Sequence, residues 1–379
     1  MKVLFVSDFI LAEEQGAKKS TVAHYESLKD IFGSHNVKVI ALNSTYHSDD
    51  VNIVCREDKQ GRIDKLANIL SGRPFLLSRG LERKMLELCK SSIYSLIFID
   101  HSIYGATIKK IKKATNTPVI CYFHGIMQYQ NDQLKAENKI SHRYGLICKS
   151  MRENEELTVK YADKCLILNE RDNRNLEKYY GVKSRYLFPV YYIDTANIDK
   201  NVSTGEFTLL FVGGYFWPNI QGITWFIDNV MPKVNSKIML YIVGHRMEEL
   251  REDLSRNNVT VVGGVENLDE WYNKADLVVG PIFKGEGMKT KTCEALMYGK
   301  RYLGTDEALE GYEGLDDYRC NSAADFVKRI NEFCENHPPK FSSEMRKLYE
   351  EKYSPQMAKK LLLKVFSDVG VQNISEEYK

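Results

Sequence analysis

Two carboxylates and two lysines surround a glycine turn in the second half of this chain, where residues 285–296 read GEGMKTKTCEAL. A carboxylate accepts hydrogen bonds from neighbouring sugar hydroxyls, and a lysine ammonium attracts phosphate as a point charge. These residue types predict a site for a phosphorylated sugar. We expect Glu286 and Glu294 at hydroxyl groups and Lys289 and Lys291 at phosphate.

The spacing of the two acids sets the size of the ligand. Glu286 and Glu294 are eight positions apart, which gives about 12 Å at most, because a helix rises about 1.5 Å per residue. A nucleoside diphosphate sugar fits that span, with Glu286 at the hexose, Glu294 at the ribose and the diphosphate between them. The alternative is a solvent-facing amphipathic helix whose charges bind nothing.

The elements around this stretch predict how it is positioned. A short β-branched run at residues 275–281 predicts a buried parallel strand, and a helix is expected from Met288 to about Tyr298, with Gly299 as a left-handed stop. The glycine turn then lies at the carboxyl end of the strand, where open α/β sheets bind ligands. Free backbone amides from Gly287 to Lys289, at the positive end of the helix dipole, favour an anion.

Alternating strand and helix signals in both halves predict the α/β class. Residues 187–206 are poorly periodic and contain Pro189 and Gly205, so they are the best linker candidate. Strands are expected at 3–6, 37–42, 96–99, 118–123 and 165–168, and then at 208–212, 239–243, 260–262 and 277–279. Ser354-Pro355 predicts the start of a final helix.

Composition excludes several classes of protein. A chain of 379 residues, 43% hydrophobic and 27% charged, is long enough for two globular domains. Its eight cysteines include no Cys-x-x-Cys pair, so neither a zinc site nor a disulfide framework is indicated. No run approaches the 18 apolar residues of a membrane span, and Asp8 comes too early for a signal-peptide core. We therefore expect a cytoplasmic protein.

Charge is unevenly distributed along the chain. Residues 1–195 contain 30 Lys and Arg against 23 Asp and Glu, whereas the remainder contains 23 against 28. The lysine-rich segment 108–113 and the Lys18-Lys19 pair predict peripheral contact of the basic half with anionic lipid at the inner face of the membrane. The alternative is a solvated helix face. A pI of about 8.0 and the lack of a stacking-aromatic motif argue against nucleic acid.

Two longer motifs resemble a known family. Glu294 opens the run EALMYGKRYLGTDEALEG, and residues 211–226 read FVGGYFWPNIQGITWF. Both are similar to the signature of the large retaining glycosyltransferase family with the GT-B fold, called family four, and to its subgroup with a W-x-P-N type motif. The resemblance is clear from about 205 to 315. It implies two Rossmann-like domains with parallel sheets facing across a cleft: 1–190 on the acceptor side, 205–352 binding the nucleotide sugar, and 354–379 as a helix crossing back to the first domain.

The resemblance also implies further site residues. His124, which ends a strand, is similar to the family histidine that contacts the donor sugar, and Gly16 lies in the position of the flexible first loop near the donor phosphates. Gly214 belongs to the donor-binding motif of residues 211–226. Backbone groups near Gly264 and Val265 are expected against the nucleobase. Asp100-His101 also ends a strand and is a weaker candidate to face the acceptor.

The chain departs from the family pattern in two places. Close members of the subgroup often have Gly where this chain has Glu286, which follows the broader family pattern. Many relatives carry an Arg, and a Lys a few residues on, after the first strand of the second domain, but this chain has Tyr215 and Phe216 there. Lys289 and Lys291 must then neutralise the diphosphate. Trp225 is expected to pack in the core, whereas Trp217 can either stack on a sugar or pack.

The sequence thus predicts a retaining, metal-independent transferase that moves a hexose from a nucleotide sugar, with a UDP-sugar favoured, to a hydroxyl of a glycan, lipid-linked or protein acceptor. Cell-surface glycan or glycoprotein assembly is the expected setting, with a homo- or hetero-oligomer left open. No metal is expected, because no Asp-x-Asp element follows a hydrophobic strand. The alternative is a non-catalytic binding or chaperone subunit of an active transferase. Glu294→Ala is expected to abolish the thermal shift caused by the donor and to leave the melting temperature of the free protein nearly unchanged.

Overall fold

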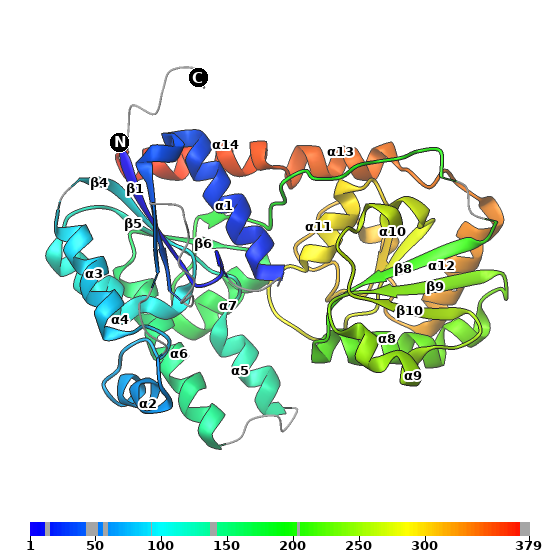
Figure 1. Cartoon of the computed structure of the whole chain (residues 1–379), viewed down its shortest axis with the longest axis horizontal. Coiled ribbons are helices and arrows are strands. Elements are labelled where there is room, and N and C mark those ends of the chain that lie inside the picture. Colours follow the sequence, from blue (N-terminus) through cyan, green and yellow to red (C-terminus); the bar gives the residue numbers. More distant parts are fainter. Residues whose placement is uncertain are drawn as a thin grey trace. The chain divides into compact units, whose positions relative to one another are not determined.

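The chain forms two compact units, Met1–Tyr191 with Pro355–Lys379, and Tyr192–Ser354. The computed structural model describes residues 1–11, 16–42, 52–55, 60–91, 93–136, 142–202 and 205–371. Figure 1 shows that each unit is built around a parallel sheet covered by helices. The boundary falls inside the predicted linker, and the last helix belongs to the first unit.

The first unit contains a seven-stranded sheet of order β3-β2-β1-β4-β5-β6-β7, and its strand pairs are parallel. The order reverses direction between β1 and β4, and the carboxyl ends of strands at such a switch point commonly form a ligand site. The strands are β1 (Lys2–Ser7), β2 (Val37–Ala41), β3 (Ile53–Cys55), β4 (Tyr94–Ile99), β5 (Val119–Tyr122), β6 (Lys164–Ile167) and β7 (Tyr186–Leu187).

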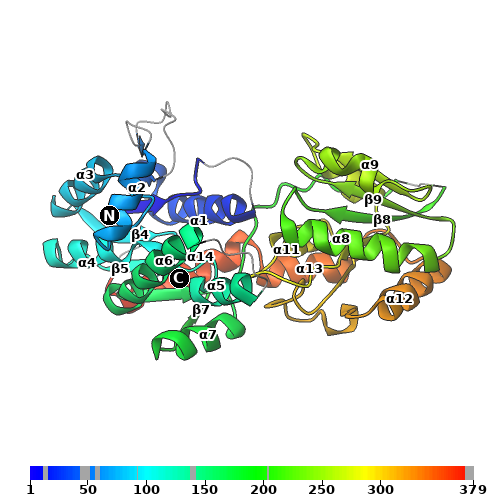
Figure 2. The ribbon, with the colours of Figure 1, turned by 90° about the horizontal axis from the view of Figure 1, so that it is seen from below.

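Helices α1 and α14 pack together in the first unit, although they come from opposite ends of the sequence (Figures 1 and 2). The rings of Phe32 and Phe366 are 5.4 Å apart at this contact. The helices of the unit are α1 (Gly16–Phe32), α2 (Arg62–Leu70), α3 (Arg79–Lys90), α4 (Gly105–Ala114), α5 (Met127–Ala136), α6 (His142–Tyr161), α7 (Glu170–Tyr180) and α14 (Pro355–Asp368), with 3-10 turns η1 (Ser34–Asn36) and η2 (Ser102–Tyr104).

The second unit contains a five-stranded sheet of order β10-β9-β8-β11-β12, also with parallel pairs. Its switch point lies between β8 and β11. The strands are β8 (Phe207–Val212), β9 (Ile238–Val243), β10 (Val259–Gly263), β11 (Leu277–Gly280) and β12 (Tyr302–Gly304). The helices are α8 (Trp217–Asn229), α9 (Arg251–Leu254), α10 (Asp269–Lys274), α11 (Thr290–Met297), α12 (Ala323–Asn336) and α13 (Ser343–Lys352), with 3-10 turns η3 (Met231–Lys233), η4 (Met247–Leu250) and η5 (Asp316–Tyr318).

Buried apolar runs explain why these segments form central parallel strands. Val3, Leu4 and Phe5 of β1 are completely buried, as are Leu209 and Leu210 of β8, because helices cover both faces of each sheet. The predicted α/β class is confirmed. The short strands β3, β7 and β12 were not predicted, since two or three residues at the sheet margins leave little pattern in the sequence.

Two local predictions have clear outcomes. Trp225 packs edge-to-face on Phe283, with ring centroids 4.7 Å apart, which confirms its core role. Helix α11 begins at Thr290, two residues later than predicted, because Lys289 is extended (φ −83°, ψ 109°). The predicted stop is confirmed, since Gly299 has φ 65°.

Within the described residues, no helix combines the length and the apolar character that crossing a membrane requires. The same residues contain no cluster of three or more His, Cys, Asp or Glu side chains placed to hold a metal ion. The eight cysteines are unpaired thiols.

Candidate functional site

Lys291 is the central cation of the second unit. It lies in the first turn of α11, but its Nζ donates to Asn219 Oδ1 at 2.6 Å and lies 4.7 Å from the centre of the Phe211 ring. Asn219 Nδ2 donates to Gly214 O at 2.8 Å. The ammonium group is therefore held at the carboxyl end of β8, the place where many relatives are expected to carry an Arg.

Gly213 makes room for this ammonium group. A Cβ atom at position 213 would lie 2.8 Å from Lys291 Nζ and 3.0 Å from Asn219 Cγ, closer than non-bonded atoms approach. Any larger residue there would displace Lys291 or Asn219. Gly213 thus leaves the space that the Lys291 ammonium group occupies, although the two residues are 78 positions apart in the chain.

The pKa of Lys291 makes its charge sensitive to a bound anion. Burial, and then the positive charge of Lys289, lower the pKa of Lys291 to about 7, while Glu294 acts in the opposite direction. A buried amine with a depressed pKa regains its charge when an anion comes into contact with it, because the anion favours the charged form. A diphosphate is an anion of this kind.

Lys289 has a different environment. Its Nζ contacts Glu307 Oε1 at 2.6 Å and donates to the carbonyl oxygens of Glu286 at 3.0 Å and Gly287 at 3.3 Å. The Lys289 and Glu307 side chains are only 13% and 12% exposed. Lys289 therefore fastens the glycine turn and has its charge balanced by Glu307, which makes Lys291 the stronger candidate for phosphate.

The turn itself depends on glycine. Gly285 and Gly287 have φ values of 143° and 60°, in a region that other residues rarely adopt. Glu286 sits between them and is partly buried, and Met288 is 6% exposed.

The amino end of α11 differs from the prediction. Because the helix starts late, its first-turn amides belong to residues 290–293 and not to residues 287–289. Thr292 N donates to Lys289 O at 3.0 Å, and Cys293 N donates to Tyr312 Oη at 3.2 Å. The amides of Gly287, Met288 and Lys289 thus precede the helix and do not form its first turn, and two amides of the first turn are used inside the protein.

Glu294 is buried and held from both sides. It is 5% exposed, and its two oxygens accept hydrogen bonds from Tyr192 Oη at 3.2 Å and Tyr272 Oη at 3.1 Å. The Tyr272 ring stacks on Tyr298 with centroids 4.2 Å apart. Burial and then the Glu294 charge raise the pKa of both Tyr192 and Tyr272, so both hydroxyls remain donors.

This arrangement fixes the orientation of the Glu294 carboxylate, a group whose two oxygens offer about four acceptor positions in all. It also corrects one expectation. Glu294→Ala is expected to lower the melting temperature, because the buried hydroxyls of Tyr192 and Tyr272 would lose the carboxylate to which they donate.

The loop after β10 was predicted to read the nucleobase through its backbone. Gly264 N already donates to Glu248 Oε2 at 3.0 Å, and Val262 O accepts from Arg251 Nη2 at 3.0 Å. Val265 is 36% exposed. The chain's own side chains therefore use part of this backbone, while Gly264 and Val265 are both exposed.

A polar cluster lies at the carboxyl ends of β1, β4 and β5 in the first unit. The completely buried Asp100 pairs through Oδ1 with His24 Nδ1 at 2.8 Å and through Oδ2 accepts from Thr21 Oγ1 and Ser7 Oγ. Burial would raise the pKa of Asp100, but the charges and hydrogen bonds of His124 and His24 bring it well below its ordinary value. Asp100 thus faces inward and not toward an acceptor.

His124 and His101 complete this cluster. His124 Nε2 lies 3.1 Å from Asp100 O and 3.4 Å from Asp100 Oδ2, so the other ring nitrogen, Nδ1, is the one suited to a sugar hydroxyl. His101 Nδ1 pairs with Asp8 Oδ2 at 2.8 Å, and both side chains are nearly buried. Asp8 was not predicted as a site residue, although a polar residue directly after the first strand indicates a position at the ligand-binding edge of the sheet.

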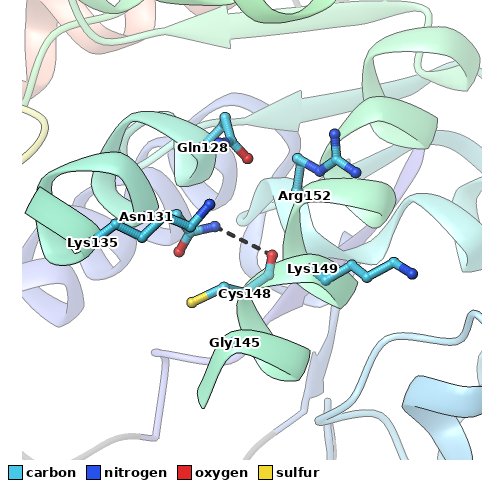
Figure 3. A pocket seen from close by; sticks show the side chains of 7 residues that line it. All are labelled: Gln128, Asn131, Lys135, Gly145, Cys148, Lys149 and Arg152. Carbon is cyan, nitrogen blue, oxygen red and sulfur yellow. Dashed lines mark hydrogen bonds between the residues drawn. The ribbon is translucent and has the colours of Figure 1, made fainter. Parts of the chain in front are cut away.

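Two further features of the first unit can be placed. Gly16 is the first residue of α1, and residues 12–15 of the predicted first loop lie outside the described residues. A hollow of about 220 Å³ lies between α5 and α6 (Figure 3). None of the predicted site residues is among those that line it, which are Gln128, Asn131, Lys135, Gly145, Cys148, Lys149 and Arg152.

Two Rossmann-like units with parallel sheets define the GT-B class of glycosyltransferase folds, and solved structures of this class match the chain. Sucrose-phosphate synthase from Thermosynechococcus elongatus matches with a TM-score of 0.72 at 13% identity, over 97% of this chain and 99% of that one. HepE from Anabaena, solved with UDP and glucose, matches with a TM-score of 0.69 at 12% identity, over 97% and 100%. The apo form of WaaB, a lipopolysaccharide outer core galactosyltransferase, gives 0.63 at 12%, over 97% and 100%.

Sequence comparison finds a glycosyltransferase family match within the second unit. Residues 206–336 match the family described as "Glycosyl transferases group 1". This part of the chain is therefore similar to a group 1 glycosyl transferase domain, and it includes Asn219, Glu286, Lys291 and Glu294. A search of curated proteins finds no match to the sequence.

Proposed function

We propose that this protein is a retaining, metal-independent glycosyltransferase that moves a hexose from a nucleoside diphosphate sugar to a hydroxyl acceptor. One observation carries the proposal: Lys291, whose pKa is lowered to about 7, is held at the carboxyl end of β8, and the buried Glu294 lies one turn further along α11. HepE, a similar fold, was solved with UDP-glucose, which supports a UDP-sugar as the donor.

Each site residue has a role in this proposal. Lys291 neutralises the diphosphate, and Asn219 holds Lys291 in place. Glu294 accepts hydrogen bonds from the ribose, and Glu286 from the hexose, in a turn that Lys289 fastens. Gly287, Met288 and Gly214 provide close backbone approach, and in the first unit His124 Nδ1 accepts from a hexose hydroxyl near Gly16. The loop at Gly264 and Val265 lies against the base.

The reaction needs charge stabilisation more than proton transfer by the protein. The bond from the anomeric carbon to the phosphate oxygen breaks as the acceptor oxygen bonds to the same face of that carbon. Because the acceptor attacks the face from which the phosphate departs, the configuration is retained, and the departing phosphate oxygen takes the acceptor's proton. Lys291 stabilises the negative charge that develops on the phosphate, and removal of one such group from a preorganised site commonly costs about a hundredfold in rate.

The first unit is the acceptor-side domain in this proposal, within residues 1–190, and residues 205–352 bind the donor. The acceptor is a glycan, a lipid-linked sugar or a protein, and the setting is cell-surface glycan or glycoprotein assembly at the cytoplasmic face of a membrane. The fold similarity to the galactosyltransferase WaaB supports a glycan acceptor.

A thermal-shift panel of UDP-, GDP-, dTDP- and ADP-sugars tests the donor. A ligand at 100 times its dissociation constant stabilises the folded state by about 2.7 kcal/mol. Lys291→Met is expected to lose the shift, whereas Lys284→Met, in the exposed part of the same loop, keeps it. Product formation with radiolabelled sugar then tests transfer, and an unchanged shift in Lys291→Met would remove the basis of the proposal.

A second candidate is a non-catalytic subunit that partners an active transferase. Tyr215 and Phe216, which replace the expected Arg region, are 42% and 56% exposed, and exposed aromatic side chains are common in protein interfaces. Donor binding without hydrolysis or transfer by the isolated chain, together with activity of a partner that depends on Phe216, would favour this alternative.

A further inference from the structure

Helix α2 presents an apolar stripe to solvent. Ile63, Leu66 and Leu70 are 84%, 47% and 78% exposed. They are spaced three and four residues apart, which places them on one face of the helix. An ordinary surface helix turns such a stripe toward the core.

The opposite face of α2 is anchored by a polar side chain. Asn68 is 2% exposed, and its Nδ2 donates to Pro74 O at 3.3 Å and Leu77 O at 2.8 Å. At the amino end, Asp64 Oδ2 accepts from Gly61 N at 3.1 Å. The Asp64 bond caps the helix, and the Asn68 bonds fix its rotation, so the apolar stripe faces outward as part of the folded structure.

The segment that contains the stripe is basic. Residues 60–91 contain seven Lys and Arg against three Asp and Glu. Arg62 on α2 and Arg79 and Arg83 on α3 are exposed. Glu82, one of the three acids, is buried and pairs with Arg73 at 2.6 Å and Lys110 at 2.9 Å, so it does little to offset the exposed cations.

Helix α6 extends the same combination of apolar and basic side chains. It packs against α2 and lies between α2 and α5 in both views (Figures 1 and 2). Near its amino end, Tyr144 and Leu146 are 37% and 47% exposed. Its other flank borders the α5–α6 hollow, where Figure 3 shows Arg152 and Lys149 on α6.

We propose that α2 docks on an anionic phospholipid bilayer, with Ile63, Leu66 and Leu70 entering the interface and Arg62 and Lys65 contacting headgroup phosphates. Three aliphatic side chains on a nine-residue helix are a small area compared with the roughly 800 Å² per partner of a stable protein interface. An apolar face with a basic rim is the pattern of a helix that lies in a membrane surface.

This surface differs from the lysine-rich segment 108–113 that the sequence suggested. Lys110 pairs with Glu82 at 2.9 Å, and Lys112 pairs with Asp163 at 2.8 Å. That segment therefore has less charge to offer lipid headgroups. Docking through α2 does not depend on the proposed transfer reaction.

Vesicle sedimentation of the full chain tests the proposal. The protein is expected to bind vesicles of phosphatidylcholine mixed with phosphatidylglycerol. The variant Ile63→Ser, Leu66→Ser, Leu70→Ser is expected to bind about tenfold or more weakly, because three inserted side chains return to water. Arg62→Gln with Lys65→Gln is expected to weaken binding about tenfold or more at low salt.

The matched control is Ile93→Ser with Val182→Ser, two aliphatic residues of the same unit that are 50% and 41% exposed and lie outside α2. It is expected to bind like the unmodified protein, and circular dichroism should show all variants folded. Undiminished vesicle binding by the triple serine variant overturns the proposal. The proposal is also overturned if the unmodified protein forms a dimer without lipid and the triple serine variant is a monomer, since the stripe would then be a protein interface.

Discussion

Donor binding is expected to draw a proton onto Lys291. The pKa of Lys291 in the free protein is about 7, lowered by burial and by Lys289. At pH 8 about nine-tenths of the molecules then carry a neutral amine at this position. A bound diphosphate restores the charged form, so the binding of one sugar nucleotide should take up about 0.9 proton at pH 8.

The same linkage predicts the pH dependence of affinity. Above pH 7 the free protein must acquire the proton before the ion pair can form, so the dissociation constant should rise about tenfold per pH unit until the pKa of the bound state is reached. Below pH 7 the ionisation of Lys291 should add no pH dependence to the dissociation constant, because Lys291 is already charged.

Isothermal titration in two buffers of different ionisation enthalpy measures the uptake. UDP-glucose is a suitable probe, because its diphosphate is a diester and has no group that titrates near neutral pH. Lys291→Met should abolish the uptake and weaken binding. Lys289→Met should keep part of the uptake, because burial is the larger cause of the lowered Lys291 pKa, but the loss of the Lys289 charge should raise that pKa and reduce the uptake. An uptake near zero in the unmodified protein, or equal uptake in Lys291→Met, would refute this account of the phosphate site.

Three further outcomes are expected. Glu294→Ala should lower the free energy of unfolding by about 2–4 kcal/mol in urea titration, because two buried tyrosine hydroxyls lose their carboxylate acceptor and a cavity forms. Glu294→Gln should recover most of that stability but not the affinity for the donor. Full donor affinity in the Gln variant would contradict a contact between Glu294 and the ribose. Gly213→Ala should weaken UDP-glucose binding about tenfold in titration, because its Cβ would lie 2.8 Å from Lys291 Nζ. Asp100→Asn should cost about 3–5 kcal/mol at pH 7 by removing a buried charge from its partners. Since the folded pKa of Asp100 is below its ordinary value, its stabilisation is complete above about pH 4 and is lost as the pH falls from there through the folded pKa, so the variant's deficit in urea should shrink at acid pH.

The sequence predicted the parts of the site that depend on local pattern. The β-branched run at 277–280 became β11, and Gly299 ended α11 in the left-handed conformation. The phosphate and sugar candidates Glu286, Lys289, Lys291 and Glu294 came from residue type and spacing alone.

The remaining features depend on contacts between residues far apart in the chain. Lys291 is held by Asn219, 72 positions earlier, and Glu294 by Tyr192, 102 positions earlier. Lys289 pairs with Glu307, 18 positions later, and the start of α11 moved by two residues. No periodicity or propensity encodes such pairs, because they arise only when the sheet brings strand ends together.

The packing of α14 on α1 affects how the chain folds during synthesis. Leu362 and Phe366 of α14 are completely buried in the first unit, yet they follow the whole second unit in the sequence, so a ribosome adds them after it. The second unit, Tyr192–Ser354, is complete before them and can fold first. Until then the apolar side chains of α1 that contact α14, such as Phe32, stay uncovered, so chaperone binding to the nascent chain should persist until α14 has emerged.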